Sequence, residues 1–314
     1  MKIACVFPGQ GAQQVGMLAD SAERWPVVAE TFTEASDVLG YDLWETVQQG
    51  PAETLNRTEV TQPALLAASV ALWRVWCQEG GAEPAYVAGH SLGEYSALVA
   101  GESLAFRDAV ELVRIRGEAM QTAVPAGEGR MAAIMGLDDD QVVAICQDLA
   151  SEGVVQAVNF NAPGQVVIAG TGACVDRAIE ACKSAGAKRA LPLDVSVPSH
   201  CALMQPAADR MAGALAGYDV SDAVIPVVQN VSASAITDAA TIRENLYWQL
   251  ISPVRWTSSV QSMVSMDVEA LVECGPGKVL TGLSKRIERG LPCYPTETPE
   301  QLEQALNACR DGGN

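Results

Sequence analysis

The chain has 314 residues, of which 49% are hydrophobic, so it is long enough to build one substantial core and a second, smaller domain. Its formal net charge of −18 argues against nucleic acids and anionic membrane surfaces as partners. We expect a cytoplasmic protein with reduced thiols and no zinc site, because the nine cysteines are never spaced C-x-x-C and neither a signal-peptide pattern nor an apolar run of bilayer length is present.

The first hundred residues alternate between strand and helix patterns. The apolar run Ile3–Phe7 predicts a strand that ends in a turn at residues 8–13, and helical patterns follow to about residue 79. Pro63 is expected to open an apolar helix over 64–76, because proline is favoured in a first turn. Residues 86–88 form the next expected strand and 92–100 the helix after it, so we expect a mostly parallel α/β sheet.

Residues 131–196 follow a different order, β-α-β-β-α-β. The expected strands are 131–136, 154–160, 166–169 and 190–195, and the expected helices are 138–151 and 171–185, with Thr171 capping the second helix. This order defines a ferredoxin-like unit. Prolines flank it, at 125 and 198, so we expect a small inserted subdomain over 126–196 and a large α/β domain made of 1–125 and 197–314.

The α/β order resumes after the insert. We expect strands at 227–231 and 268–273, a helix at 241–250 that is stopped by Pro253, and a helix at 278–287. Residues of the large domain therefore lie on both sides of the insert in sequence, and a site built from both would open into the cleft between the two domains.

A nucleophile elbow is predicted at residues 89–93, which read Gly-His-Ser-Leu-Gly. This G-x-S-x-G pattern between an apolar run and a helical pattern is typical of a sharp strand-to-helix turn. The turn needs glycines on both sides of the serine, because a β-carbon there would collide with the neighbouring backbone. It exposes the hydroxyl of Ser91, so the sequence predicts serine-based acyl chemistry; an ordinary turn is the competing interpretation.

His200 is the main candidate for the base that activates Ser91, because the chain has only one other histidine. That histidine, His90, is the serine's neighbour, and its side chain should leave the turn in another direction. No Asp or Glu stands out as a third member, and a backbone carbonyl that accepts from Nδ1 can select the same tautomer. Cys201, beside His200, is interpreted as structural.

The glycine-rich turn Gly9–Gln13 has two interpretations, which the spacing leaves open. It is a poor match to a phosphate-binding loop, because Gln14 stands where a third glycine is needed. Its backbone amides, with that of Leu92 after the nucleophile, would make an oxyanion hole. A purely conformational turn is nearly as well supported.

Arg116 stands out on the helix pattern over 107–120. At about 100° per residue, Arg114 shares a face with glutamates, whereas Arg116 lies about 170° from the centre of that face, among apolar residues. A buried guanidinium without a partner is costly, so something anionic must meet it. The two possibilities are an internal carboxylate and a substrate carboxylate bound bidentately.

Taken together, the motifs resemble those of the malonyl-CoA:acyl carrier protein transacylase family. The resemblance runs from about residue 1 to 289, and residues 290–314 add nothing to it. The segments that carry it are PGQGAQ (8–13), GHSLGEYSAL (89–98), the helix with Arg116, VNFNAPGQVVIAG (158–170), VPSH (197–200), YWQLISPVRW (247–256) and ECGPGKVL (273–280).

The resemblance implies a hydrolase-like α/β domain with a ferredoxin-like insert, and a role for each matched residue. Ser91 is the implied nucleophile, and His200 the implied base and acid, oriented by the carbonyl of Gln249. Gln10 and Leu92 are the implied oxyanion donors, and Arg116 the implied ligand of the malonyl carboxylate. The implied partners are malonyl-CoA and acyl carrier protein, in a ping-pong reaction without metal or other cofactor, and we expect a monomer.

Two other functions compete with this one. A discrete acyltransferase or editing hydrolase of a polyketide pathway would use the same fold and serine. A catalytically inactive module that only binds acyl carrier protein is disfavoured by the presence of Ser91, His200 and Arg116 together. The sequence leaves open which carrier protein is served and whether methylmalonyl groups are also accepted.

Overall fold

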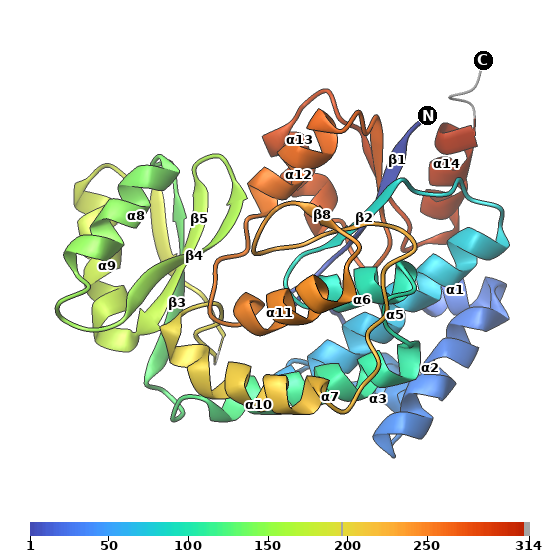
Figure 1. Cartoon of the computed structure of the whole chain (residues 1–314), viewed down its shortest axis with the longest axis horizontal. Helices are drawn as coiled ribbons and strands as arrows, with labels where there is room; N and C mark the ends of the chain where they lie inside the picture. The colour runs from blue at the N-terminus through green and yellow to red at the C-terminus, as the bar shows by residue number, and fades with distance from the viewer. Residues whose placement is uncertain (196, 311–314) are drawn as a thin grey trace.

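The computed structural model describes residues 1–195 and 197–310, which form two lobes, each built on its own sheet (Figure 1). Residue 196, the predicted end of the insert, and residues 311–314, at the end of the predicted large domain, lie outside the described residues. No helix of the described part is long and apolar enough to cross a membrane.

The sheet of the large lobe has the order β10-β9-β1-β2-β7-β8. All neighbours are parallel except β7 and β8, which form an antiparallel pair. The strands are β1 (Ile3–Phe7), β2 (Tyr86–Gly89), β7 (Val227–Val228), β8 (Ala235–Ile236), β9 (Ala270–Glu273) and β10 (Cys293–Pro295). The predicted mostly parallel α/β sheet is therefore confirmed.

Helices cover both faces of this sheet. The helices of the large lobe are α1 (Ala19–Arg24), α2 (Pro26–Leu39), α3 (Leu43–Gln49), α4 (Ala52–Leu55), α5 (Thr58–Gln78), α6 (Gly93–Ala100), α7 (Phe106–Thr122), α10 (Gln205–Leu215), α11 (Ala239–Gln249), α12 (Trp256–Ser265), α13 (Val279–Ile287) and α14 (Pro299–Arg310), with a 3₁₀ turn at Ala202–Met204.

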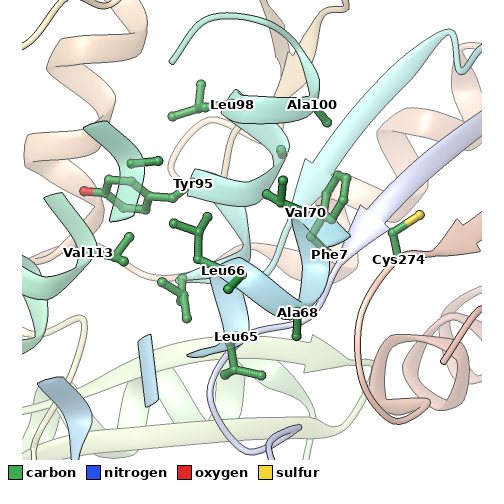
Figure 2. Close-up of a cluster of buried hydrophobic side chains, with 14 of the residues drawn as sticks. Phe7, Leu65, Leu66, Ala68, Val70, Tyr95, Leu98, Ala100, Val113 and Cys274 are labelled. Atoms are coloured by element: carbon green, nitrogen blue, oxygen red, sulfur yellow. The ribbon is translucent and has the colours of Figure 1, made fainter. Parts of the chain in front are cut away.

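Strand β1 shows how the two faces are filled. Its odd-numbered residues pack with α5, α6 and α7, whereas Ala4 and Val6 pack with α12 and α13, as the period of two in a strand requires. All five residues are buried, which is typical of a central parallel strand. Figure 2 shows the first of these clusters, where Phe7 and side chains of α5 and α6 gather in one core.

The expected start of the helix at Pro63 is wrong, because Pro63 lies inside α5, which begins at Thr58. A proline inside a helix costs ~3 kcal/mol or more, because a backbone hydrogen bond is lost and the ring clashes with the carbonyl of the preceding turn. Here the preceding turn is stabilised by packing: Thr61 is buried and donates its hydroxyl to the carbonyl of Leu55. Helix α7 passes so close that a β-carbon on Gly117 would lie 2.7 Å from the Cα of Glu59.

The small lobe carries the predicted element order, and its sheet has the order β4-β5-β3-β6 with antiparallel neighbours throughout. Its elements are β3 (Gly129–Met135), α8 (Asp139–Asp148), β4 (Val155–Ala162), β5 (Gln165–Thr171), α9 (Gly172–Ser184) and β6 (Arg189–Pro192). Its two helices cover one face of the sheet and enclose a separate core, and the lobe stands apart from the rest in Figure 1.

Three predicted details of the elements differ from the structure. Strand β7 ends at Val228 rather than at residue 231, because the chain turns back at 229–234 to pair with β8. Strand β6 ends at Pro192 rather than at 195, although the amide of Leu193 still donates to the carbonyl of Met131 in β3. Thr171 occupies the cap position of α9, but its hydroxyl contacts the carbonyl of Val154 instead of a helix amide.

The lobes are joined along β4. The amide of Val254, in the large lobe, donates to the carbonyl of Val158, and its carbonyl accepts from the amide of Phe160. The hydroxyl of Thr257 donates to the carbonyl of Phe160 as well, at 3.0 Å. Residues 158–160 of the insert are therefore hydrogen-bonded to the large lobe.

Candidate active site

Ser91 lies at a tight turn between β2 and α6, with a positive φ of 52°. Both flanking glycines are required by close backbone contacts. A β-carbon on Gly89 would lie 1.9 Å from the carbonyl carbon of Gly93, and one on Gly93 would lie 2.1 Å from the carbonyl oxygen of Phe7. The predicted strand, turn and helix are thus present, and the serine lies at the carboxyl end of the parallel strands, where α/β sites open.

His200 reaches Ser91 from the other side of the insert. Its Nε2 lies 2.7 Å from Ser91 Oγ, and its Nδ1 lies 2.7 Å from the carbonyl oxygen of Gln249. The carbonyl can only accept, so Nδ1 carries the proton and Nε2 is left to accept from the serine. Burial and the positive charge of Arg116 lower the pKa of His200 to about 3, so the imidazole is neutral and able to act as a base.

His90 does point away from Ser91. Its Nε2 lies 2.7 Å from Oδ1 of Asn161, in the small lobe, and its ring lies beside Trp256. Burial lowers the pKa of His90 too. Cys201 is buried, and its thiol donates to the carbonyl of Pro198.

Arg116 is 1% exposed and lies on the apolar face of α7, as predicted. Its guanidinium donates to Oε1 of Gln62 at 2.9 Å and to Oε1 of Gln249 at 3.0 Å, and NH2 lies 3.3 Å from Ser91 Oγ. The ring of Tyr95 lies beneath it, with the centroid 5.7 Å from Cζ. Two residues earlier, Arg114 forms ion pairs with glutamates on the solvated face.

The described residues offer Arg116 no carboxylate within ion-pair distance, so an internal ion pair does not account for its burial. Its hydrogen-bond acceptors, the amide oxygens of Gln62 and Gln249 and the hydroxyl of Ser91, are all neutral. Burial accordingly lowers the pKa of Arg116, which reflects an incompletely compensated cation. Such a group favours an anion that enters from the adjoining cavity.

Gln249 contributes three groups to this site. Its backbone carbonyl accepts from His200, its side-chain oxygen accepts from Arg116, and its Nε2 donates to the carbonyl oxygen of Ser91 at 3.0 Å. It lies at the end of α11 and is fully buried. One residue therefore sets the positions of the base, the arginine and the nucleophile's backbone.

Gln10 and Leu92 both line the cavity at Ser91. In the described part of the chain, neither backbone amide donates to a protein acceptor, so both are open to a substrate oxygen. The amide of Ser91 itself is engaged, because it donates to Oδ1 of Asn230 at 2.7 Å.

The sequence did not predict the buried carboxyl group of Glu94. It lies in the first turn of α6 with no solvent exposure, accepts from the amide of Asn230 at 2.7 Å, and lies 3.4 Å from Nε2 of Gln229. Burial raises the pKa of Glu94 to about 7, although the amide of Asn230, the side chains of Gln249 and Gln229 and the charge of Arg116 oppose the rise.

A cavity of about 140 Å³ opens beside Ser91 Oγ between the two lobes. Its lining residues are Gln10, Thr58, His90, Ser91, Leu92, Arg116, Met120, Met131, Asn159, Leu193, Val195, Val197, Ser199 and His200. Among the described residues, Oδ1 of Asn159 is buried without a hydrogen-bond partner. A wider groove of about 900 Å³, between α8 and residues 253–261, contains none of the predicted site residues. Across the described residues, no group of three or more His, Cys, Asp or Glu side chains could hold a metal ion.

The structure brings together all six predicted site residues and adds others that sequence reasoning missed. Glu94 carried a signal, since it is the one charged residue in 93–100. Gln62 was hidden by the wrong helix start, and Asn230 by the overlong strand. Asn159 lies in a segment that carried the resemblance, but its contact with the cavity depends on how the lobes are joined.

Known proteins are similar to this chain over nearly its whole length. The family described as acyl transferase domain matches residues 4–290. The malonyl CoA-acyl carrier protein transacylase of Salmonella typhimurium is 59% identical over 305 residues, which cover 97% of this chain and 99% of that protein. The protein of the same name from Bacillus subtilis is 46% identical over 99% of this chain and 98% of its own length.

Solved structures are similar over nearly the whole chain. A malonyl-transacylase in complex with a type II polyketide synthase acyl-carrier protein superposes with a TM-score of 0.96 at 55% identity, covering 98% of this chain and 100% of that one. The malonyl CoA-acyl carrier protein transacylase of Coxiella burnetii gives 0.96 at 47% identity, covering 98% and 97%.

Proposed function

The chain belongs to the acyl transferase family, among the malonyl CoA-acyl carrier protein transacylases, and on that premise we propose that Ser91 carries a malonyl group from malonyl-CoA to the phosphopantetheine thiol of acyl carrier protein. This acyltransferase activity supplies fatty-acid chain elongation. The observation that carries the assignment of residues is the 2.7 Å contact between Ser91 Oγ and a neutral His200, beside a buried arginine that lacks a carboxylate partner.

In the first half-reaction, Ser91 Oγ attacks the thioester carbonyl as His200 Nε2 takes its proton. The carbon–sulfur bond then breaks, and His200 returns the proton to the departing CoA thiolate, which leaves a malonyl ester on Ser91. The carbonyl of Gln249 stabilises the transient imidazolium through Nδ1. In the second half-reaction, His200 deprotonates the thiol of the carrier protein, and the thiolate attacks the ester carbonyl. The bond between the acyl carbon and Ser91 Oγ then breaks, and His200 returns the proton to Oγ, which restores the serine.

The backbone amides of Leu92 and Gln10 supply the oxyanion hole in both half-reactions. Leu92 is at the start of α6, where the helix dipole also favours negative charge. Each donor is worth ~3 kcal/mol by analogy with single-donor deletions in other enzymes.

Arg116 binds the malonyl carboxylate. The side-chain oxygens of Gln62 and Gln249 accept hydrogen bonds from the guanidinium and orient it, but they carry no charge that would neutralise it. A carboxylate held there would keep the acyl group away from water, so transfer is favoured over hydrolysis.

The architecture and the remaining partner predictions belong to the same proposal. We assign the large lobe (1–125 and 197–314) as hydrolase-like and the insert (126–196) as ferredoxin-like; the support is the element order, the sheet order and the separate core of the insert. The monomeric state, the cytoplasmic location and the absence of nucleic-acid or membrane partners stay predictions based on charge and composition.

Intact-mass spectrometry tests the assignment. The protein, mixed with malonyl-CoA, should gain one malonyl group, and peptide mapping should place it on Ser91. Ser91→Ala should fold normally and gain none, because the change removes only a hydroxyl. Labelling of Ser91→Ala at the wild-type rate would show that the nucleophile is another residue. Adding acyl carrier protein should move the group to the carrier.

A further inference from the structure

Asn230 connects the elbow to the turn after β7, and all of its polar groups are hydrogen-bonded. Its Oδ1 accepts from the amide of Ser91 at 2.7 Å, and its Nδ2 donates to the carbonyl of Gly89 at 2.6 Å. Its own amide donates to Glu94 Oε2 at 2.7 Å, and its carbonyl accepts from the amide of Arg255 at 3.1 Å. Asn230 is 1% exposed, so water does not replace these bonds.

Resting on the proposed function of Ser91, we propose that Asn230 is a positioning residue that fixes the backbone of the nucleophile, and that Glu94 acts through it by fixing Asn230. We call the two residues the elbow clamp. The side chain of Asn230 is hydrogen-bonded to the backbone of Gly89 and of Ser91, on either side of His90, and so spans the tight part of the turn.

The elbow needs such a clamp because of the backbone conformation of Ser91. A residue with a β-carbon is sterically disfavoured in the left-handed region, where Ser91 lies at φ 52°, relative to the right-handed region. The bond from the Ser91 amide to Asn230 opposes relaxation of that dihedral. Without it, Oγ would move relative to His200 Nε2, and a shift of about 1 Å is enough to slow a reaction ~10²-fold.

Glu94 completes the clamp from inside the protein. Its carboxyl group has no solvent exposure. It accepts a hydrogen bond from the backbone amide of Asn230 and a longer one from the side-chain amide of Gln229, in the same turn. If Glu94 were shortened, the buried amide of Asn230 would lose its acceptor, and the turn would rearrange to find another. Glu94 therefore transmits its effect to Ser91 without touching the reacting atoms.

The test is a set of variants: Asn230→Ala, Glu94→Ala, Glu94→Gln and the double variant Asn230→Ala/Glu94→Ala. Ser234→Ala is the matched control, since it alters the same turn without contacting the elbow. The readout is the single-turnover rate of Ser91 acylation, normalised to the folded fraction from near-ultraviolet circular dichroism, with malonyl-CoA and with acetyl-CoA.

Asn230→Ala should slow acylation by both thioesters about 10²-fold, with unchanged half-saturation by malonyl-CoA, because its side chain bonds only to the backbone of the elbow. Glu94→Ala should slow acylation by both thioesters to a similar degree. The double variant should be no slower than either single one, since both remove one clamp. Glu94→Gln keeps an acceptor and should be at least about tenfold faster than Glu94→Ala. Ser234→Ala should match the wild type. Full activity of Asn230→Ala, or a loss confined to malonyl-CoA, would overturn the proposal.

Asn230→Asp covers the case in which the alanine variants fail to fold. Its carboxylate would face the Gly89 carbonyl, whereas its protonated form can donate there. The ratio of its acylation rate to that of the wild type should therefore rise as the pH falls from 7.5 to 5, and a flat ratio would contradict the clamp. The wild type, measured in parallel, accounts for titration of Glu94. A wild type that is not acylated on Ser91 would refute the proposed function instead; the reaction of Ser91 with a neutral fluorophosphonate would then still test the clamp.

Discussion

Replacing Arg116 by alanine should separate malonyl from acetyl transfer. The guanidinium is buried against two neutral amide oxygens, so the substrate carboxylate would be its anionic partner. A hydrogen bond to a charged group is worth ~1.5–3 kcal/mol, and a bidentate carboxylate makes two, which gives ~3–6 kcal/mol. At 1.36 kcal/mol per tenfold change, kcat/KM for malonyl-CoA should fall about 10²–10⁴-fold. Acetyl-CoA has no carboxylate, and its kcat/KM should change less than about threefold.

The assay is the initial rate of transfer to acyl carrier protein with each thioester. Arg114→Ala is the matched control, because it lies on the same helix and forms ion pairs only with Glu111 and Glu118 at the surface. It should lose less than ~1 kcal/mol of stability and leave both rates unchanged. Equal losses with malonyl-CoA and acetyl-CoA in Arg116→Ala, at an unchanged thermal midpoint, would refute the substrate-binding role.

Three further outcomes follow from the geometry. His200→Ala should slow acylation of Ser91 on the order of 10³-fold or more, measured by quenched-flow mass spectrometry. Because the pKa of His200 is about 3, protonation of His200 should not slow acylation between pH 7.5 and 5. The test is the pH profile of Glu94→Gln, in which residue 94 no longer titrates, and a break near pH 6.5 in that profile would contradict this. The folded protein resists protonating His200, so urea melts should show stability falling as the pH drops from about 6.5 towards 3. Gln62→Leu should lower kcat/KM for malonyl-CoA about tenfold and spare acetyl-CoA, measured in the same transfer assay.

The sequence sufficed for the elements whose signals are local. The elbow is specified by glycines that avoid close backbone contacts, and β1 by an uninterrupted apolar run. The burial of Arg116 followed from its place on a helix face, because helical geometry fixes angles over short distances. The order of the insert was also readable, since each of its elements has its own period.

What the sequence could not provide depends on contacts between distant segments. Pro63 was placed at a helix start by its ordinary preference, but packing of α7 at Gly117 supports an earlier start. Asn230 has no local pattern, because its role arises only when the turn after β7 meets the elbow. The orienting carbonyl of Gln249 was identified by resemblance alone, since any residue has a backbone carbonyl.

The position of β1 in the sheet has a consequence for synthesis of the chain. Its two neighbours are β2, which ends at residue 89, and β9, which begins at residue 270. At about 5–20 residues per second, a ribosome needs ~10–40 s to make the stretch between them. During that interval the insert can complete its own sheet, whereas one edge of β1 stays unpaired. The nascent large lobe is therefore the part of this protein that stays open to aggregation longest, and its exposed edge closes only after both Ser91 and His200 have been synthesised.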